Sequence, residues 1–146
     1  SAIARSAVLV AAVVLGGTTV AAAQERIVPD RWKSTYEQYH YAPAVRVGNV
    51  LYLSGVVAGD ADPERQFEQV FQRLKGVLEA AGSSLADVVE MTTYHVRMRD
   101  HIDTFIQVKD RHMKEPYPAW TAIGIDQLFS PQAIVEVKVT ALVRQQ

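Results

Sequence analysis

The sequence predicts an α+β protein in which helices pack on one face of a mixed β-sheet. Two amphipathic helical patterns alternate with β-like stretches in the order β-β-α-β-α-β-β. The last stretch, residues 134–143, alternates apolar and other residues with a period of two, which is typical of a strand with one buried face. A chain of 146 residues has the length of a single domain.

The first two strands are expected at residues 44–47 ("AVRV") and 50–54 ("VLYLS"), on either side of Gly48-Asn49. Both runs are rich in residues that favour strands, and a Gly-Asn break between them is a hairpin signal. The preceding residues 24–40 are polar and aromatic but have no clean period, so we expect an irregular lead-in there.

The first helix begins at Asp62-Pro63-Glu64. Asp can accept a hydrogen bond from the free N–H groups of the first turn, Pro suits the first helical position, and Glu suits the positive end of the helix dipole. Gly82 is expected to end the helix in a left-handed conformation. Apolar residues recur at spacings of three and four and predict one buried stripe; they are Phe67, Val70, Phe71, Leu74, Val77, Leu78 and Ala81.

A strand is expected at 88–98, followed by a second helix that Asp100 caps and that Pro116 and Pro118 end. Lys109 interrupts the apolar stripe of this helix, which consists of Ile102, Phe105, Ile106 and Met113. Residues 120–128 form a further extended segment before the final strand at 134–143.

The composition excludes several kinds of site. The chain has no cysteine, so disulfides, thiolate nucleophiles and cysteine-based metal sites are excluded. Its net charge is −1 and it has no run of Lys and Arg, so we do not expect nucleic-acid binding. None of the four histidines is spaced i, i+4 from another or surrounded by carboxylates, so we expect no metal site.

The first 23 residues have the pattern of a secretory signal peptide. Arg5 is followed by the apolar run 7–15 and by small residues ending in "AAA" at 21–23. A buried helix or a membrane anchor is the alternative, but Gly and Thr at 16–19 interrupt the apolar run. We therefore expect cleavage after Ala23 and a secreted or periplasmic protein.

Several segments together resemble the Rid family (reactive intermediate deaminases, also called the YjgF or endoribonuclease L-PSP family). These segments are "YAPAVRVG" at 41–48, "LYLSG" at 51–55, "LEAAGSSLADVV" at 78–89, "YPAWT" at 117–121 and "IVEV" at 134–137. They follow the family's order and spacing over residues 41–143. We therefore expect a Rid-like domain over residues 41–146.

This resemblance implies a chorismate-mutase-like fold, with two helices on one face of a mixed sheet. It also implies a homotrimer with clefts between neighbouring subunits. The family's founding activity is the hydrolysis of short-lived imines or enamines, and it needs neither a metal nor an organic cofactor. In the family, an arginine binds the substrate carboxylate, while a carboxylate on the last strand and a backbone carbonyl help to position water.

This sequence matches the family's site residues at some positions and differs from them at others. Tyr41 matches the cleft tyrosine, Ser54-Gly55 the Ser-Gly after the second strand, and Glu136 the last-strand carboxylate. The arginine position falls on Trp120, followed by Thr121, and a position that often carries asparagine falls on Ile106. An indole has one neutral N–H donor where guanidinium would make a charge-assisted pair. Trp120 either lines the cleft or packs in the core.

Three classes of function remain open from the sequence. The first is the binding of a small molecule in a cleft between subunits, without the standard 2-imino-acid deaminase activity. The second is hydrolysis of a different, less acidic imine or enamine, with Glu136 orienting water. The third is a structural, interaction or ribonuclease-type role. A Glu136 that faces a cavity keeps catalysis open, whereas one paired with an arginine such as Arg97 is structural.

Overall fold

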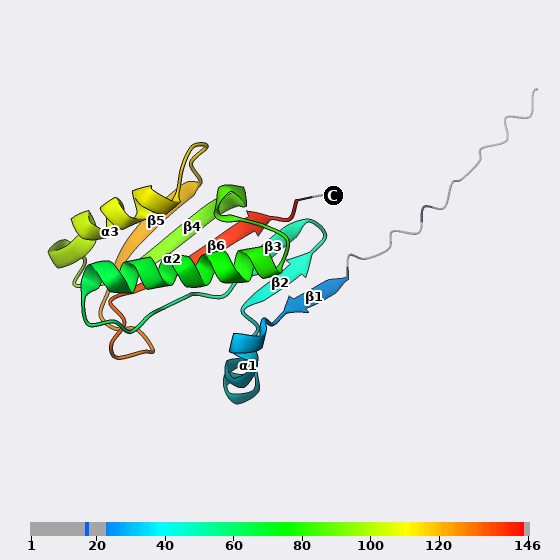
Figure 1. The fold of residues 1–146 in the computed structure, drawn as a ribbon, viewed down its shortest axis with the longest axis horizontal. Coiled ribbons are helices and arrows are strands. Elements are labelled where there is room, and N and C mark those ends of the chain that lie inside the picture. Colours follow the sequence, from blue (N-terminus) through cyan, green and yellow to red (C-terminus); the bar gives the residue numbers. More distant parts are fainter. Residues whose placement is uncertain (1–16, 18–22, 145–146) are drawn as a thin grey trace, which may run out of the picture.

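A computed structural model describes residue 17 and residues 23–144 (Figure 1). The predicted signal segment lies outside the described residues except for Gly17 and Ala23. No helix in the described part has the length and apolar character needed to cross a bilayer. The elements in chain order are β1 (Gln24–Ile27), η1 (Asp30–Trp32), α1 (Lys33–Tyr39), β2 (Ala44–Val47), β3 (Val50–Leu53), α2 (Pro63–Ala80), η2 (Leu85–Asp87), β4 (Val88–Val96), α3 (Met98–His112), β5 (Ala119–Ile125) and β6 (Val135–Leu142).

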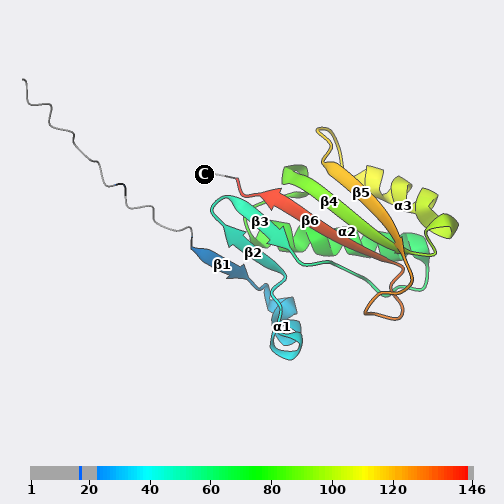
Figure 2. The same ribbon diagram turned by 180° about the vertical axis from the view of Figure 1, so that it is seen from behind.

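The strands form one mixed sheet with the order β1-β2-β3-β6-β4-β5. Only β4 and β5 pair in parallel, and the other neighbours are antiparallel. α2 and α3 cover one face of this sheet, and the view from behind shows the opposite face without a helix (Figures 1 and 2). The predicted α+β class and the chorismate-mutase-like arrangement are confirmed.

The prediction of an irregular lead-in at residues 24–40 is wrong. β1 extends the sheet by pairing with β2, from Gln24 opposite Val47 to Ile27 opposite Ala44. α1 follows it and has no buried residue. Most side chains of both elements are exposed to water, so neither element needs a periodic pattern of apolar residues. Backbone hydrogen bonds form them, and such bonds leave no pattern in the sequence.

α2 follows its predicted start and stop signals. The Asp62 carboxylate accepts a hydrogen bond from the backbone N–H of Arg65 at 3.0 Å, and Pro63 occupies the first helical position. Gly82 adopts the left-handed conformation, with a φ of 77°. All seven residues of the predicted apolar stripe are buried. This stripe therefore forms the main contact of α2 with the sheet.

The boundaries of the later elements differ from the predicted ones. β4 ends at Val96 because Arg97 adopts a left-handed conformation, with a φ of 51°, and α3 begins at Met98. Asp100 does not cap this helix but forms an ion pair with Arg97 at 3.8 Å. β5 begins at Ala119 and ends at Ile125, where its pairing with β4 ends.

β6 lies between β3 and β4, near the middle of the sheet (Figure 2). Its alternate residues Val135, Val137, Val139 and Ala141 are at most 2% exposed and belong to the core under the helices. Residues between them, Glu136 among them, are directed to the opposite, helix-free face. That face carries the half-exposed apolar residues Tyr52, Ile123 and Leu142.

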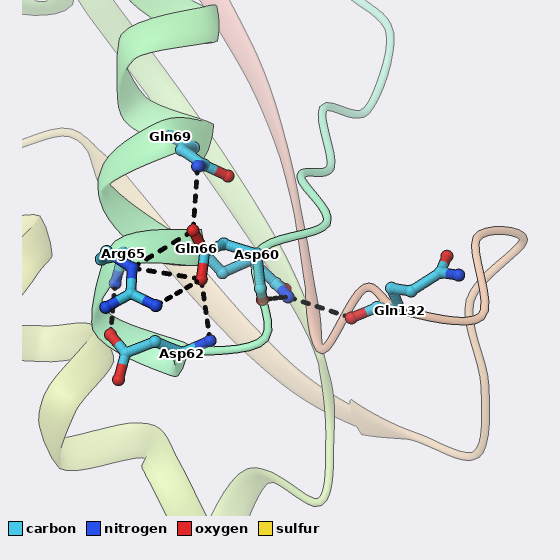
Figure 3. A network of polar contacts seen from close by, with 6 residues as sticks. All are labelled: Asp60, Asp62, Arg65, Gln66, Gln69 and Gln132. Carbon is cyan, nitrogen blue, oxygen red and sulfur yellow. Dashed lines mark hydrogen bonds and ion pairs between the residues drawn. The ribbon is translucent and has the colours of Figure 1, made fainter.

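A buried glutamine ties the segment before β6 to α2 (Figure 3). The amide nitrogen of Gln66 donates to the carbonyl oxygens of Asp60 and Gln132, at 2.8 and 3.0 Å. Its amide oxygen accepts from the backbone N–H of Ile134 at 2.8 Å. Gln66 is only 1% exposed, and its polar groups are satisfied by these contacts. The loop between β5 and β6 is thereby held against the start of α2.

Two buried histidines should make the fold sensitive to acid. Burial, with a smaller effect of nearby His101, lowers the pKa of His95 from 6.5 to about 4. Burial also lowers the pKa of His101. Above pH 6.5 these rings are neutral in both the folded and the unfolded chain. Below pH 6.5 the unfolded chain binds protons that the folded chain does not. We therefore expect the free energy of unfolding to fall between pH 6.5 and 4, by up to about 1.4 kcal/mol per pH unit for one histidine.

Urea unfolding at several pH values measures this slope, and an NMR titration of the His95 ring checks its pKa directly. His95→Gln removes this buried titrating ring and should reduce the slope. A His95 ring that titrates near its ordinary pKa would contradict the prediction.

Candidate functional site

A pocket on the helix-free side of β6 brings together four of the site residues predicted from the sequence. It has a volume of about 310 Å³, within the range of small-molecule sites. Tyr41, Ser54, Gly55 and Glu136 line it, together with Val57, Phe129 and Ser130. We refer to it as the Tyr41–Glu136 pocket.

Backbone pairing beyond the end of β3 positions the carboxylate. Val56 and Val137 exchange two backbone hydrogen bonds of 2.9 and 3.0 Å, so the chain after β3 continues alongside β6. This pairing places Gly55 next to Glu136. The sequences around Val56 and Val137 do not predict this pair of hydrogen bonds, because it depends on which strand lies beside β3.

Ser54 connects the tyrosine segment to the same place. Its backbone N–H donates to the carbonyl oxygen of Pro43 at 2.9 Å, and its hydroxyl donates to the carbonyl oxygen of Ala42 at 2.7 Å. These two bonds hold the residues that follow Tyr41 against the end of β3. Ser54 therefore acts here through its contacts with the backbone, and its hydroxyl proton is already engaged.

Gly55 is required by the close approach of the Glu136 side chain. A Cβ atom at position 55 would overlap Oε1, Cδ and Cγ of Glu136. The absence of a side chain at Gly55 lets the carboxylate lie against the backbone of the neighbouring segment. The two residues thus form one structural unit, although 80 positions separate them in the sequence.

The carboxyl of Glu136 is the main ionisable group of the pocket. Burial raises its pKa above the ordinary value. No ion-pair partner of Glu136 occurs among the described residues, and Arg97 instead pairs with Asp100. Burial, and secondly the charge of Glu136, raise the pKa of Tyr41. The tyrosine therefore stays a neutral hydroxyl, while the carboxylate is an unpaired acceptor.

An aromatic residue from the loop between β5 and β6 forms part of the rim. Phe129 is 89% exposed and contacts the ring of Tyr39 edge-on, with centroids 5.7 Å apart. Sequence reasoning missed Phe129, Ser130 and Val57. The signal that was available is a phenylalanine in the segment 126–132, where Asp126, Gln127, Ser130 and Gln132 indicate an exposed loop.

The other predicted site residues lie apart from this pocket within one chain. Trp120 lies opposite Met91 in the register and faces α3, where its ring is 6.2 Å from that of Phe105. Thr121 is exposed on β5, and Ile106 is half-buried on α3. None of the three lines the Tyr41–Glu136 pocket. At 37% exposure, Trp120 both packs on the core and presents a surface to solvent.

The lining of the pocket contains one carboxylate, two hydroxyl-bearing side chains besides Tyr41, and no lysine or arginine. The guanidinium of Arg73 is held by the carbonyl oxygen of Val57 and does not line the pocket. Across the described residues, no group of three or more His, Asp or Glu side chains is placed to hold a metal. The arrangement can accept protons and hydrogen bonds, and it can bind a positive charge.

Comparison with known proteins finds relatives over most of the chain. The family model described as Endoribonuclease L-PSP matches residues 33–143. The RutC family protein YjgH of Escherichia coli is 32% identical, over 82% of this chain and 95% of that protein. The 2-iminobutanoate/2-iminopropanoate deaminase of Dermatophagoides farinae is 32% identical, over 60% of this chain and 74% of that protein. A solved structure of a YjgH protein superposes with a TM-score of 0.76 at 28% identity, covering 84% of this chain and 98% of that one.

Gly55→Ala should displace the Glu136 carboxylate from its place against the backbone, since the new Cβ would overlap it. A carboxyl that moves towards water loses part of the burial that raises its pKa, so this pKa should fall towards the ordinary value. A ¹³C NMR titration of the carboxyl measures the change.

The control is Gly76→Ala on α2, where a Cβ meets nothing within 4 Å. It should leave the Glu136 pKa unchanged and raise the free energy of unfolding by about 0.5–1 kcal/mol, because Ala favours a helix more than Gly does. Equal Glu136 pKa values in wild type and Gly55→Ala would refute the role given to Gly55.

Proposed function

The chain belongs to the endoribonuclease L-PSP (Rid) family, and from that premise we propose that it binds a small neutral or cationic molecule in the Tyr41–Glu136 pocket. We further propose that it lacks the standard deaminase activity on 2-imino acids. The ligand's apolar part lies against Phe129 and Val57, and its polar or positive group faces Glu136. The resemblance to the family supports a cleft between subunits as the setting of this pocket.

The observation that carries the proposal is the charge of the lining. Glu136 is an unpaired, half-buried carboxylate, and no cationic side chain lines the pocket. A substrate carboxylate placed here would face Glu136 without a partner. A charge-assisted hydrogen bond contributes about 1.5–3 kcal/mol, so its absence weakens binding by roughly tenfold to a hundredfold. Trp120, at the position where the family has its arginine, supplies no cation.

Hydrolysis of an imine or enamine without a carboxylate is the second candidate function. It is favoured by the raised pKa of Glu136, which makes this carboxylate a better proton acceptor from water than an exposed glutamate. The names of relatives as deaminases agree with this chemistry. A ribonuclease-type role is less well supported, because a polyanion needs a basic cleft and the lining has no lysine or arginine.

A homotrimer is the assembly we propose. Tyr52, Ile123 and Leu142 are 49%, 40% and 40% exposed on the helix-free face of the sheet, and Val89 is 44% exposed. Apolar side chains gathered on one face are typical of a surface that another subunit covers. A trimer would also allow a neighbouring chain to complete the Tyr41–Glu136 pocket.

Three ligands with the same apolar body test the charge preference of the pocket: propylammonium, propanamide and propanoate. We expect the cation to bind best and propanoate worst, as measured by NMR shifts of the Ser54 and Gly55 amides. Glu136→Gln should remove the preference, whereas Glu79→Gln on the exposed part of α2 should not. Preferential binding of propanoate would refute the proposed ligand class.

The same reasoning predicts little or no hydrolysis of 2-iminopropanoate or 2-iminobutanoate, measured as the rate of ammonia release above the uncatalysed reaction. Efficient turnover of either compound would overturn the second part of the proposal. It would mean that another cation, for example from a neighbouring subunit, binds the carboxylate.

Light scattering at micromolar concentration tests the assembly, and we expect the mass of a trimer. Leu142→Asp on the helix-free face should shift the mass towards the monomer. The control, Gln72→Asp, changes an exposed residue of α2 on the other side of the sheet and should leave the mass unchanged. A monomeric wild-type protein would rule out the proposed homotrimer.

A further inference from the structure

Three aromatic side chains gather at the Tyr41–Glu136 pocket. Tyr41 and Phe129 line it, and the ring of Tyr39 contacts that of Phe129 edge-on, with centroids 5.7 Å apart. Burial raises the pKa of Tyr41 most, and the nearby Glu136 and Tyr39 raise it further, so the two tyrosines lie close together. We refer to Tyr39, Tyr41 and Phe129 as the aromatic rim.

Packing in the core does not explain these three rings. All three side chains are exposed, and none belongs to the hydrophobic core. Tyr39 is the last residue of α1, a helix without any buried residue. Large aromatic side chains that gather in one exposed place are typical of a binding surface. The aromatic rim therefore indicates contact with a ligand.

The backbone between the two tyrosines has an unusual conformation. His40 is left-handed, with a φ of 58°, which is uncommon for a residue other than glycine. Its backbone N–H donates to the carbonyl oxygen of Tyr36 at 3.0 Å and ends α1. The chain changes direction at this residue, between Tyr39 and Tyr41. Backbone strain of this kind is concentrated at functional sites, which agrees with a rim that is built to bind.

Aromatic faces beside a carboxylate are suited to one class of cation. The face of an aromatic ring is negative and attracts a cation that lies within about 6 Å of its centroid. Glu136 is half-buried and has no ion-pair partner in the part of the chain that the structure describes, so its charge adds to that attraction.

The substituents on the cation decide how well it uses the rings. A primary ammonium has three N–H donors, and a ring face satisfies them less well than water does. A trimethylammonium group has no N–H donor, and its methyl groups carry the positive charge into contact with the rings. Recognition of quaternary ammonium groups is the best known use of such aromatic sites.

We propose that the ligand of the Tyr41–Glu136 pocket carries a quaternary, N-methylated ammonium group. This inference rests on the proposed function, in which the pocket binds a small neutral or cationic molecule, and it narrows the ligand to one class. The methyl groups lie against Tyr41 and Phe129, while Glu136 balances the charge. A nitrogen with four alkyl groups has no proton to give and cannot be part of an imine, so this ligand agrees with binding without deaminase activity.

Three alcohols of similar shape test the inference: choline, ethanolammonium and 3,3-dimethylbutan-1-ol, which is the neutral counterpart of choline. Each is titrated into the full chain, and the NMR shifts of the Ser54 and Gly55 amides report binding. We expect choline to bind about fivefold more tightly than either of the others.

The outcomes separate this inference from the proposed function. Ethanolammonium that binds as tightly as choline would overturn the inference and leave the proposed function intact, because the pocket would still prefer a cation. Equal binding of choline and 3,3-dimethylbutan-1-ol would also overturn the inference. If none of the three compounds shifts the Ser54 and Gly55 amides, both the inference and the proposed function are wrong.

Variants of one exposed residue identify the ring. Phe129→Leu keeps an apolar side chain but removes the aromatic face, and it should weaken choline binding by about twofold to fivefold. Phe129→Tyr is the matched control, because it keeps the ring and should keep the affinity. Glu136→Gln should weaken the binding of choline but not that of 3,3-dimethylbutan-1-ol. If Phe129→Leu and Phe129→Tyr bind choline equally well, the role given to the aromatic rim is wrong.

Discussion

The burial of one face of β6 near the centre of the sheet is the constraint on which the rest of this molecule depends. β6 pairs with β3 on one side and β4 on the other, so the last strand of the chain holds the two parts of the sheet together. Its residues Val135, Val137 and Val139 are packed in the core that α2 and α3 cover. The sheet cannot form its full width until β6 has found this position.

The same burial determines the position of the functional carboxylate. Because side chains alternate along a strand, directing Val135 and Val137 to the core directs Glu136 to the opposite face. The bridge between Val56 and Val137 then sets Gly55 beside it. The packing of an apolar face and the placement of a polar site are therefore two consequences of one strand register, and a slip of a single residue would exchange them.

The Tyr41–Glu136 pocket and the surroundings of Trp120 have opposite electrostatic character for reasons of local structure. In the Tyr41–Glu136 pocket, a carboxylate lies against a glycine and no cation is within the lining. At Trp120, the helix α3 directs Lys109 across the face of the indole ring. The indole also anchors the edge strand β5 to β4 through Thr93. Trp120 thus packs on the core with one part of its ring and exposes another part to solvent. Neither of the two interpretations from the sequence, a cleft residue or a core residue, is therefore sufficient by itself.

What the sequence by itself determined is the set of elements that carry an apolar period. The stripe of α2 and the period of two in β6 are local patterns that appear in the structure because burial requires them. The Asp62 cap is also local, because its carboxylate accepts a hydrogen bond from a free N–H group of the first turn. The family resemblance also indicated Tyr41, Ser54, Gly55 and Glu136, and these four do meet in one pocket. Tertiary structure alone decided the regular elements β1 and α1, the face that Trp120 occupies, and the part of Phe129 in the rim. Exposed elements, strand neighbours and loop contacts leave no period in the sequence, because they depend on which distant segments the folded backbone brings together.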